Sequence, residues 1–325
     1  MASADQIKAL IRSHAEKDDS RFYSIAMQMA AQAARQGHAR LAEELRSLID
    51  EAKEKGTESS NQSLVQIAQP RGELAGLLSV AYPKIQFSSL IMPDMSMQRL
   101  QRILLEQRQR SKLLQHGLNP RRKILLFGPP GTGKTFTASA LAGELHLPLY
   151  TILLDGLITK YMGETAAKLR LVFENINNIR GVYFFDEFDA IGAHRASSND
   201  VGEIRRVLNS FLQFLEQSNG ESVVLAATNN AELLDKALFR RFDDVIEYHL
   251  PDKELAAKTF QNCFASIGVK SINYDLLAEK SGGLSFAEIC KACEDSIKQV
   301  VLDDGSKALT NELVLKNLEE RFASK

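Results

Sequence analysis

Residues 124–137, ILLFGPPGTGKTFT, decide the fold of this chain. Four apolar residues run into the pattern G-x-x-x-x-G-K-T, and a helix-compatible segment follows it. Gly128, Gly131 and Gly133 let backbone N–H groups turn onto phosphate oxygens, and the next helix adds the positive end of its dipole. The stretch therefore predicts a phosphate-binding loop between a buried strand and a helix.

Two side chains of this loop suit phosphates and a metal ion. Lys134 supplies a mobile cation for β- and γ-phosphates, and the Thr135 hydroxyl is a hard oxygen ligand of the kind that Mg²⁺ prefers. We expect the nucleotide to contact the loop residues Gly128, Pro129, Pro130, Gly131, Thr132, Gly133, Lys134, Thr135 and Phe136. A chance glycine-rich turn would not combine the strand, the helix and all the fixed positions.

The composition indicates an ordinary globular protein of two or three domains. The 325 residues exceed what one core usually holds, and the net charge of −1 lacks the basic excess of a nucleic-acid binder. No apolar run approaches the length of a membrane span, and the N-terminus has no signal-peptide pattern. The odd count of three cysteines suits a reducing compartment, so we expect a cytoplasmic protein without a membrane span. Cys290 and Cys293 lie in a helical pattern, which favours core packing over a zinc or redox pair.

The segments before the phosphate loop predict a small helical domain on a tether. Three apolar stripes at helical spacing predict a three-helix bundle over residues 1–55, suited to recruiting a client or partner. The polar stretch GTESSNQS opens a linker that we place at residues 56–82. At its end, Leu74, Leu77 and Leu78 predict a short helix, and a longer helix is expected over residues 97–114.

From residue 122 onward, apolar strands alternate with helices, which is typical of an α/β fold with a mostly parallel sheet. The expected strands are residues 124–127, 149–153, 182–185, 223–227 and 245–248. Ligands of open α/β sheets bind at the carboxyl ends of the strands. Site residues should therefore converge at that edge.

Polar residues at two strand ends complete a phosphate-transfer pattern. Asp186 ends the third strand and can reach the Mg²⁺ held by Thr135, usually through water, while Glu187 can polarise an attacking water. Asn229 ends the fourth strand, where an amide can orient a neutral water. A solvated acidic turn and a simple strand cap are the alternatives without function.

These motifs together resemble the AAA branch of the AAA+ ATPases. The resemblance rests on GPPGTGKT, FFDEFDAI, AATN, LDKALFRRFD and GLSFAEI, and it covers residues 83–325. It implies ATP and Mg²⁺ as cofactors, a P-loop NTPase sheet over residues 83–250 and a helical lid over residues 251–325. It also implies a phosphate-loop strand flanked by the Asp-Glu and Asn strands, and homo-oligomeric rings, typically hexamers. The spacing of LDKALFRRFDD is most similar to the katanin and spastin branch, whose members also carry a small helical N-terminal domain on a linker.

The same resemblance assigns residues that act outside the chain's own phosphate loop. Arg240 and Arg241 take the place of paired arginine fingers, which reach the γ-phosphate bound by a neighbouring subunit. Lys160, Tyr161 and Met162 take the place of a pore loop that grips polypeptide in the ring channel. Residues 194–202 take the place of a second pore loop, and a mobile surface loop is an equal alternative.

On the lid side, Gly283, Leu284, Ser285 and Ala287 take the place of the motif that borders the nucleotide, and Ile91 and Ala287 are the expected contacts near the adenine. Three features depart from the family. Phe286 replaces a usual glycine, a second-sensor arginine is missing, and residues 90–94 lack paired glycines. These departures affect the adenine side and leave the phosphate chemistry as expected.

Two functions of different class follow. The first is an ATP-hydrolysing ring motor that remodels or threads a protein client. The alternative is a nucleotide-switched scaffold that regulates a protein partner, for example a separate hydrolase, without threading. DNA-dependent loading is disfavoured by the nearly neutral charge, and microtubule severing by the absence of a basic run in the linker.

Overall fold

The computed structural model describes most of the chain from residue 70 onward and a few residues before it. The described residues are 25–27, 29–30, 43, 47, 70, 72–157, 162–188, 201–230, 239–265, 272–303 and 309–323. The chain divides into two compact units, residues 1–69 and 70–325. Every described residue of the first unit is helical, and the rest of the predicted three-helix bundle lies outside the described residues.

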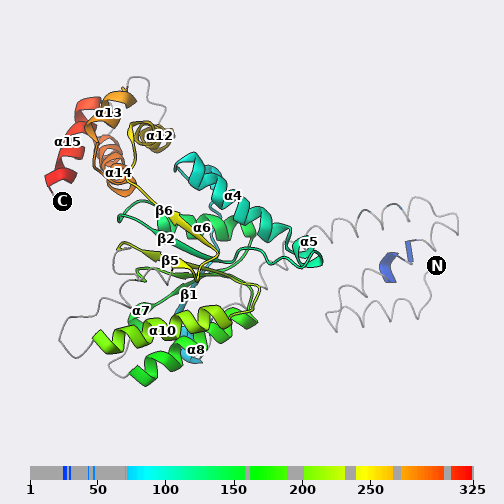
Figure 1. Ribbon diagram of the computed structural model, residues 1–325. Helices are drawn as coiled ribbons and strands as arrows, with labels where there is room; N and C mark the ends of the chain where they lie inside the picture. Colours follow the sequence, from blue (N-terminus) through cyan, green and yellow to red (C-terminus); the bar gives the residue numbers. More distant parts are fainter. Residues whose placement is uncertain are drawn as a thin grey trace. The chain divides into compact units, whose positions relative to one another are not determined.

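A six-stranded sheet forms the centre of the second unit (Figure 1), in the order β1-β3-β4-β5-β2-β6. The strands are β1 (Leu78–Ala81), β2 (Lys123–Phe127), β3 (Leu149–Ile152), β4 (Val182–Phe185), β5 (Val223–Thr228) and β6 (Asp244–Glu247). Neighbours are parallel except β1, which runs antiparallel to β3. The predicted α/β fold with a mostly parallel sheet is confirmed, and the carboxyl ends of β2, β4 and β5 lie at one edge.

The order of the strands corrects one expectation. The phosphate-loop strand β2 lies between β5 and β6, whereas the Asp-Glu strand β4 lies beyond β5 and is not its neighbour. All four residues of β4 are buried, so β4 needs a strand on each side, and β3 and β5 supply them. The half-exposed β6 suits the edge next to β2 instead.

The strand β1 corrects a second expectation. Residues 78–81 fall where the sequence predicts a short helix at the end of a linker, but they pair with β3 in register from Leu78 opposite Ile152 to Ala81 opposite Leu149. In the described part of the second unit, the strand is preceded by the 3₁₀ helix η1 (Gly72–Gly76). A segment of four residues is too short to separate a period of two from a helical period, and the pairing with β3 decides that it is a strand.

Helices cover both faces of the sheet (Figure 1). They are α4 (Asp94–Arg108) and α6 (Lys134–Leu145) on one face, and α8 (Met162–Asn178) and α10 (Val201–Gln217) on the other. Phe184 of β4 belongs to the buried cluster with α4 and α6. Its neighbour Phe185 points the opposite way and contacts the rings of Phe173 in α8 and Phe211 in α10. Consecutive strand residues therefore build two separate cores.

Short elements connect these layers. They are η2 (Phe87–Ser89), α5 (Arg110–Gln115) and α7 (Leu154–Leu157). The helix expected over residues 97–114 is divided into α4 and α5, because the backbone of Gln109 leaves the helical region. None of the helices in the described part of the chain is long and apolar enough to cross a membrane.

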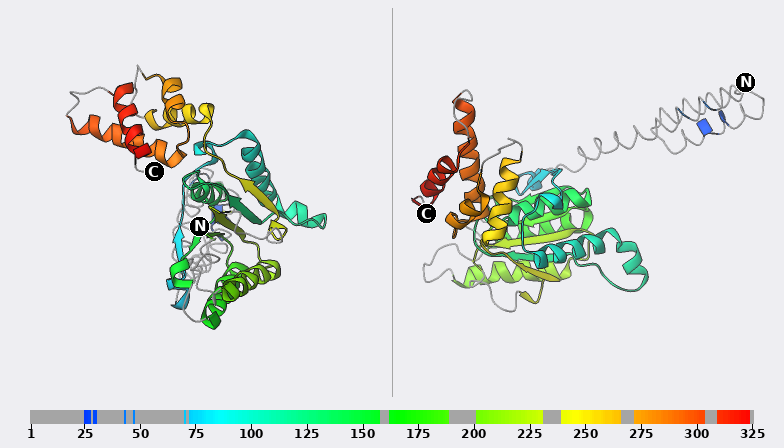
Figure 2. Two further views of the ribbon diagram at one scale, coloured as in Figure 1. Left: turned by 60° about the vertical axis from the view of Figure 1, so that its left-hand side comes forward. Right: turned by 90° about the horizontal axis from the view of Figure 1, so that it is seen from above.

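Four helices beyond β6 form a lid with a core of its own (Figure 2). They are α12 (Lys253–Phe264), α13 (Tyr274–Lys280), α14 (Phe286–Leu302) and α15 (Asn311–Ala323). Phe260, Leu277 and Leu318 are among its buried residues. The predicted C-terminal helical part is confirmed. It could be predicted because each helix carries a clear apolar stripe and the first three follow a side-chain cap.

Candidate nucleotide site

Gly128 directly follows β2 and fixes the start of the phosphate-binding loop. Its φ is +144°, and a Cβ built on it would lie 2.1 Å from the carbonyl oxygen of Tyr248. The Gly128 N–H donates to the carbonyl oxygen of Thr228, 3.2 Å away, which ties the loop to β5. Only a glycine can make this close approach between neighbouring strands.

Lys134 is the first residue of α6, and its side chain folds back into the loop. Its Nζ donates hydrogen bonds of 2.8 Å to the carbonyl oxygens of Gly128 and Pro129. The Thr132 hydroxyl closes the same turn by donating to the Pro129 carbonyl at 2.8 Å. Because the side chain of Lys134 is buried, the loop holds a cation at the start of a helix, which suits phosphate oxygens.

Thr135 and Asp186 meet between the phosphate loop and the end of β4. The Thr135 Oγ1 donates a 2.8 Å hydrogen bond to Oδ2 of Asp186. A hydroxyl oxygen and a carboxylate oxygen placed together are hard ligands, and this pair fits Mg²⁺ in its chemistry. The two residues predicted to share a metal ion are therefore neighbours. This holds although β5 lies between β2, which leads into the phosphate loop, and β4, which leads into Asp186.

The backbone turns sharply at Glu187, which follows Asp186 at the end of β4. Its φ is +47°, a left-handed conformation that a non-glycine residue rarely adopts. The turn is held at both ends, because the Glu187 N–H donates to Oδ1 of Asp186 at 3.0 Å and the Phe188 N–H donates to the Ala227 carbonyl at 2.8 Å. The fixed turn keeps the exposed Glu187 carboxylate separate from Asp186 while both line one cleft.

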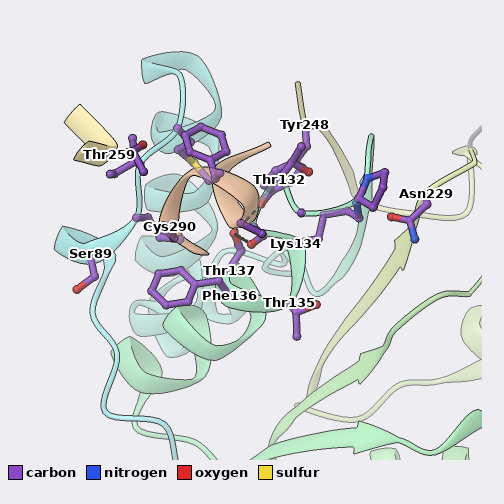
Figure 3. A pocket seen from close by; sticks show the side chains of 18 of the residues that line it. Ser89, Thr132, Lys134, Thr135, Phe136, Thr137, Asn229, Tyr248, Thr259 and Cys290 are labelled. Carbon is purple, nitrogen blue, oxygen red and sulfur yellow. Dashed lines mark hydrogen bonds between the residues drawn. The ribbon is translucent and has the colours of Figure 1, made fainter. Parts of the chain in front are cut away.

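Asn229 follows β5 and lines the same cleft (Figure 3). Its position depends on β5 lying next to β2, where Thr228 is opposite Phe127. The buried Thr228 hydroxyl accepts a 3.0 Å hydrogen bond from the Asn230 N–H, which holds the turn after the strand. The amide of Asn229 is therefore presented from a fixed turn at the carboxyl edge of the sheet.

Arg240 and Arg241 lie away from this cleft. They come just before β6, so they stand at the amino ends of β2 and β6, where the Asp243 N–H donates to the Lys123 carbonyl at 2.7 Å. They border a separate hollow with Lys123 and Glu216, and Arg241 forms an ion pair with Glu216 of α10. The five residues of β2 span about 16 Å, which separates both arginines from their own phosphate loop.

The residues expected in the ring channel are mostly outside the described part of the chain. Lys160 and Tyr161 are not described, and Met162 is placed only as the first residue of α8. The second candidate pore loop, residues 194–202, is undescribed up to residue 200. Both pore-loop assignments stay predictions.

The lid closes the other side of the cleft. The Ala287 N–H donates to the Gly131 carbonyl at 3.0 Å, so the first turn of α14 is bonded directly to the phosphate loop. A Cβ on Gly131 would lie 2.6 Å from Oγ of Ser285. Ser285 caps α14 and forms a capping box with Glu288. The loop and the lid are therefore packed together without space for a larger residue at Gly131.

The resulting cleft has a volume of about 620 Å³. Of the predicted nucleotide contacts, Ile91, Phe136 and Ala287 line it together with the loop from Pro130 to Thr135, whereas Gly128 and Pro129 shape the loop without lining it. The sequence analysis missed several lining residues. These are Ser89, Leu90, Met92, Thr137, Tyr248, Thr259, Asn262, Cys263 and Cys290. Phe286 also lines the cleft, whereas the sequence analysis named it only as a difference from the AAA pattern.

Tyr248 and Thr137 form one of these unexpected contacts. The Tyr248 hydroxyl donates to Oγ1 of Thr137 at 2.7 Å, and both side chains are buried. Burial raises the pKa of Tyr248 well above its ordinary value, more than the hydrogen bond with Thr137 lowers it, so the phenol stays neutral. The only signal in the sequence was an aromatic residue at the end of the fifth strand.

The cysteines also differ in part from the prediction. Cys293 is fully buried in the lid core, as predicted. Cys290 instead lines the cleft, and its Sγ lies 3.6 Å from Sγ of Cys263 in α12. The contact with Cys263, together with burial, raises the pKa of Cys290 far above its ordinary value. Among the described residues, no group of three His, Cys, Asp or Glu side chains could hold a metal ion.

Comparison with known proteins agrees with this geometry. The family model for the ATPase family associated with various cellular activities (AAA) matches residues 124–250. An uncharacterized AAA family ATPase of Sinorhizobium fredii, y4kL, is 32% identical over 305 residues, which cover 93% of this chain and 91% of that protein. The chain belongs to the AAA family.

Other AAA relatives are similar over a shorter region. A proteasome-activating nucleotidase of Saccharolobus solfataricus is 34% identical over 207 residues, and one of Sulfurisphaera tokodaii is 36% identical over 189 residues. The chain spans about half the length of these two proteins, 52% and 48% respectively.

Proposed function

We propose that this AAA ATPase hydrolyses ATP in the cleft between the phosphate loop and the lid. The observation that carries the proposal is the 2.8 Å hydrogen bond from Thr135 to Asp186, beside the buried Lys134 and next to Glu187. This arrangement offers a cation for phosphates, two oxygen ligands for a metal ion and a separate carboxylate for water. No simpler binding role requires all of them at one edge of the sheet.

Each residue has a distinct part in this proposal. Lys134 and the loop N–H groups bind the β- and γ-phosphates, and Thr135 and Asp186 would hold Mg²⁺, which supplies positive charge against the phosphate oxygens when it is bound. Glu187 accepts the proton of the attacking water, and Asn229 orients that water. Ile91 and Ala287 contact the base and ribose side.

Arg240 and Arg241 complete the site of a neighbouring copy. Their position at the amino ends of β2 and β6 supports this proposal, because they face away from the cleft of their own chain. Guanidinium groups suit the charge that develops on the γ-phosphoryl group. The catalytic assembly is then a homo-oligomeric ring, which we propose to be a hexamer.

The ring acts on a protein client in the cytoplasm. Two relatives are named proteasome-activating nucleotidases, which supports a role with proteins rather than nucleic acids. We propose that the unit before residue 70 recruits the client or partner, and that Lys160, Tyr161 and Met162 grip it in the channel. Membership of the katanin and spastin branch remains a prediction that rests on LDKALFRRFDD. The names of the reported relatives do not mention that branch.

The chemistry is tested by Glu187→Gln, measured as phosphate release and as binding of a fluorescent ATP analogue. We expect hydrolysis to fall by a factor of about 100 or more, with binding kept, because the water loses its base while the phosphate contacts stay. Glu174→Gln on the exposed side of α8 is the matched control and should hydrolyse ATP normally. Turnover near wild type in Glu187→Gln would contradict the assignment.

A nucleotide-switched scaffold is the second candidate, and Tyr161→Ala separates it from a motor. For a motor, ATP hydrolysis stays within about threefold of wild type, a difference of about 0.7 kcal/mol in the barrier, while client processing falls severely. The measurement compares the ATPase rate with client unfolding or activation. Normal processing of the client by Tyr161→Ala would favour the scaffold.

A further inference from the structure

The cleft has two chemically different ends. Lys134, Asp186, Glu187 and Asn229 supply charge and hydrogen bonds around the phosphate loop. Figure 3 shows Phe136, Cys290 and Thr259 well apart from Asn229, on the side of the cleft away from it. A nucleotide whose phosphates occupy the loop therefore extends its sugar and base toward an apolar end.

Phe136 is a large apolar side chain that the protein core does not use. It is 41% exposed, although it lies in the first turn of α6. Ala138 and Leu141 of the same helix are fully buried. They belong to the core cluster between the sheet and the helices α4 and α6, which among the described residues does not include Phe136. An exposed phenyl ring in the wall of a cleft is typical of a ligand contact.

Phe286 is a second aromatic side chain that lines the cleft, and it lies one helical turn before Cys290 on the same side of α14. It is the first residue of α14, and it is half-buried in the wall of the cleft. The lid core, as far as it is described, is built from residues such as Ile289 and Cys293 and does not include Phe286. The hydrogen bond from Ala287 to Gly131 fixes this turn against the phosphate loop. The Phe286 ring thus lines the cleft without belonging to the described lid core.

The surroundings of the two rings are neutral. Cys263 and Cys290 line the same end, and Cys290 keeps its proton because the contact with Cys263 and burial raise its pKa. Neutral thiols are polarisable, and they make favourable contacts with aromatic rings. The apolar end therefore suits the face of a planar heterocycle more than a charged group.

We propose that Phe286, together with Phe136, binds the base of the nucleotide by stacking against it. The inference rests on the proposed function, because it places the phosphates in the loop. It goes further by assigning a base-binding role to Phe286, which has no part in the proposed function. Stacking is tolerant of base identity, so the two rings contribute affinity to purines in general.

The test measures the affinity of two ligands that differ only in whether they carry a base and sugar. ATP and inorganic tripolyphosphate each displace a fluorescent ATP analogue from the full chain in the presence of Mg²⁺. The variants are Phe286→Ala and Phe286→Leu, which keeps an apolar side chain without a ring. Phe322→Ala is the control for loss of a phenyl ring elsewhere, since Phe322 in α15 is exposed and does not line the cleft.

We expect Phe286→Ala to weaken ATP binding by about 5- to 150-fold, the range for loss of one stacked aromatic side chain. Phe286→Leu should lose about 2- to 10-fold, because it keeps the contact area but not the ring. Tripolyphosphate should bind both variants as it binds wild type, which also shows that the loop is folded. Phe322→Ala should bind both ligands normally.

Two results would overturn the proposal. One is ATP affinity within about twofold of wild type in Phe286→Ala, given the range expected for stacking. The other is a parallel loss of tripolyphosphate, which would mean that the substitution disturbs the loop. Lys134→Ala separates this inference from the proposed function, because it should lose both ligands. Wild-type protein that binds neither ligand would contradict the proposed function and the base subsite together.

Discussion

At the scale of single residues, the phosphate loop depends on a backbone position that excludes side chains. Gly128 combines a positive φ with an approach to Tyr248 that leaves no space for a Cβ. Gly133 in the same loop also has a positive φ, but a Cβ there would meet nothing within 4 Å. The two glycines therefore differ in what a substitution costs.

We expect Gly128→Ala to lower the free energy of unfolding by about 3 kcal/mol or more and to abolish ATP binding. Backbone strain and the clash with the Tyr248 carbonyl add together at this position. Gly72→Ala is the matched control, because Gly72 has a φ of +62° with open space around it and lies outside the cleft. Chemical denaturation and nucleotide binding measure both effects. Equal stabilities of the two variants would show that the approach to Tyr248 is unimportant.

The residues that the sequence analysis found share one property, since each belongs to a motif that is continuous along the chain. Lys134, Thr135, Asp186 and Glu187 are placed by a loop or a strand end, and the parallel sheet brings those ends together. Tyr248 and Thr137 are 111 residues apart, and only the pairing of strands makes them neighbours. No pattern within one segment could indicate that hydrogen bond.

At the scale of elements, β1 is the part of the second unit that could not be predicted from the sequence. Leu77 and Leu78 are each 3% exposed, and the Leu153 N–H donates to the Leu77 carbonyl at 2.8 Å. The strand covers the edge of β3 that would otherwise be open. The compact unit accordingly begins at Pro70 rather than at the residue 83 expected from the motifs.

Two truncations test this boundary. A chain that begins at Pro70 should keep the stability and the ATP binding of the full chain. A chain that begins at Pro83 should lose about 3–6 kcal/mol in the free energy of unfolding, which is the burial contribution of the two leucines that it lacks, and should aggregate through the uncovered edge of β3. Denaturation curves and light scattering give both quantities. Equal stability of the two chains would mean that β1 is not part of the folded unit.

The other elements could be predicted because their periodicity is long or their ends are marked. The lid helices carry apolar stripes and caps, and β4 and β5 are continuous apolar runs. The order of the strands could not be predicted from their patterns alone. Burial of β4 on both sides and half-exposure of β6 decide the order, and both depend on the assembled sheet.

At the scale of the whole molecule, the direction of the strands separates the two groups of residues to which we assign catalytic roles. The phosphate loop lies at the carboxyl end of β2, and Arg240 and Arg241 lie at its amino end. A single chain cannot bring both to one phosphate without disrupting the sheet. In the ring that we propose, the arginines of one copy lie against the cleft of the next, and assembly is then a condition for fast hydrolysis.

The central claim is an ATPase site shared between two copies, and mixing two inactive chains tests it most directly. One chain carries Arg240→Ala and Arg241→Ala, and the other carries Glu187→Gln. Each is expected to hydrolyse ATP slowly alone, because one lacks the charge on the γ-phosphoryl group and the other lacks the base. In mixed rings, the intact cleft of the first chain meets the intact arginines of the second.

We predict that phosphate release reappears in the mixture and depends on the ratio of the two chains. The matched control mixes the Glu187→Gln chain with a chain that carries all three substitutions, so that no interface contains a complete site and no activity should return. The measurement is the ATPase rate across mixing ratios, with co-assembly verified by differently labelled chains. Absence of hydrolysis at every ratio, in rings shown to contain both chains, would contradict the account.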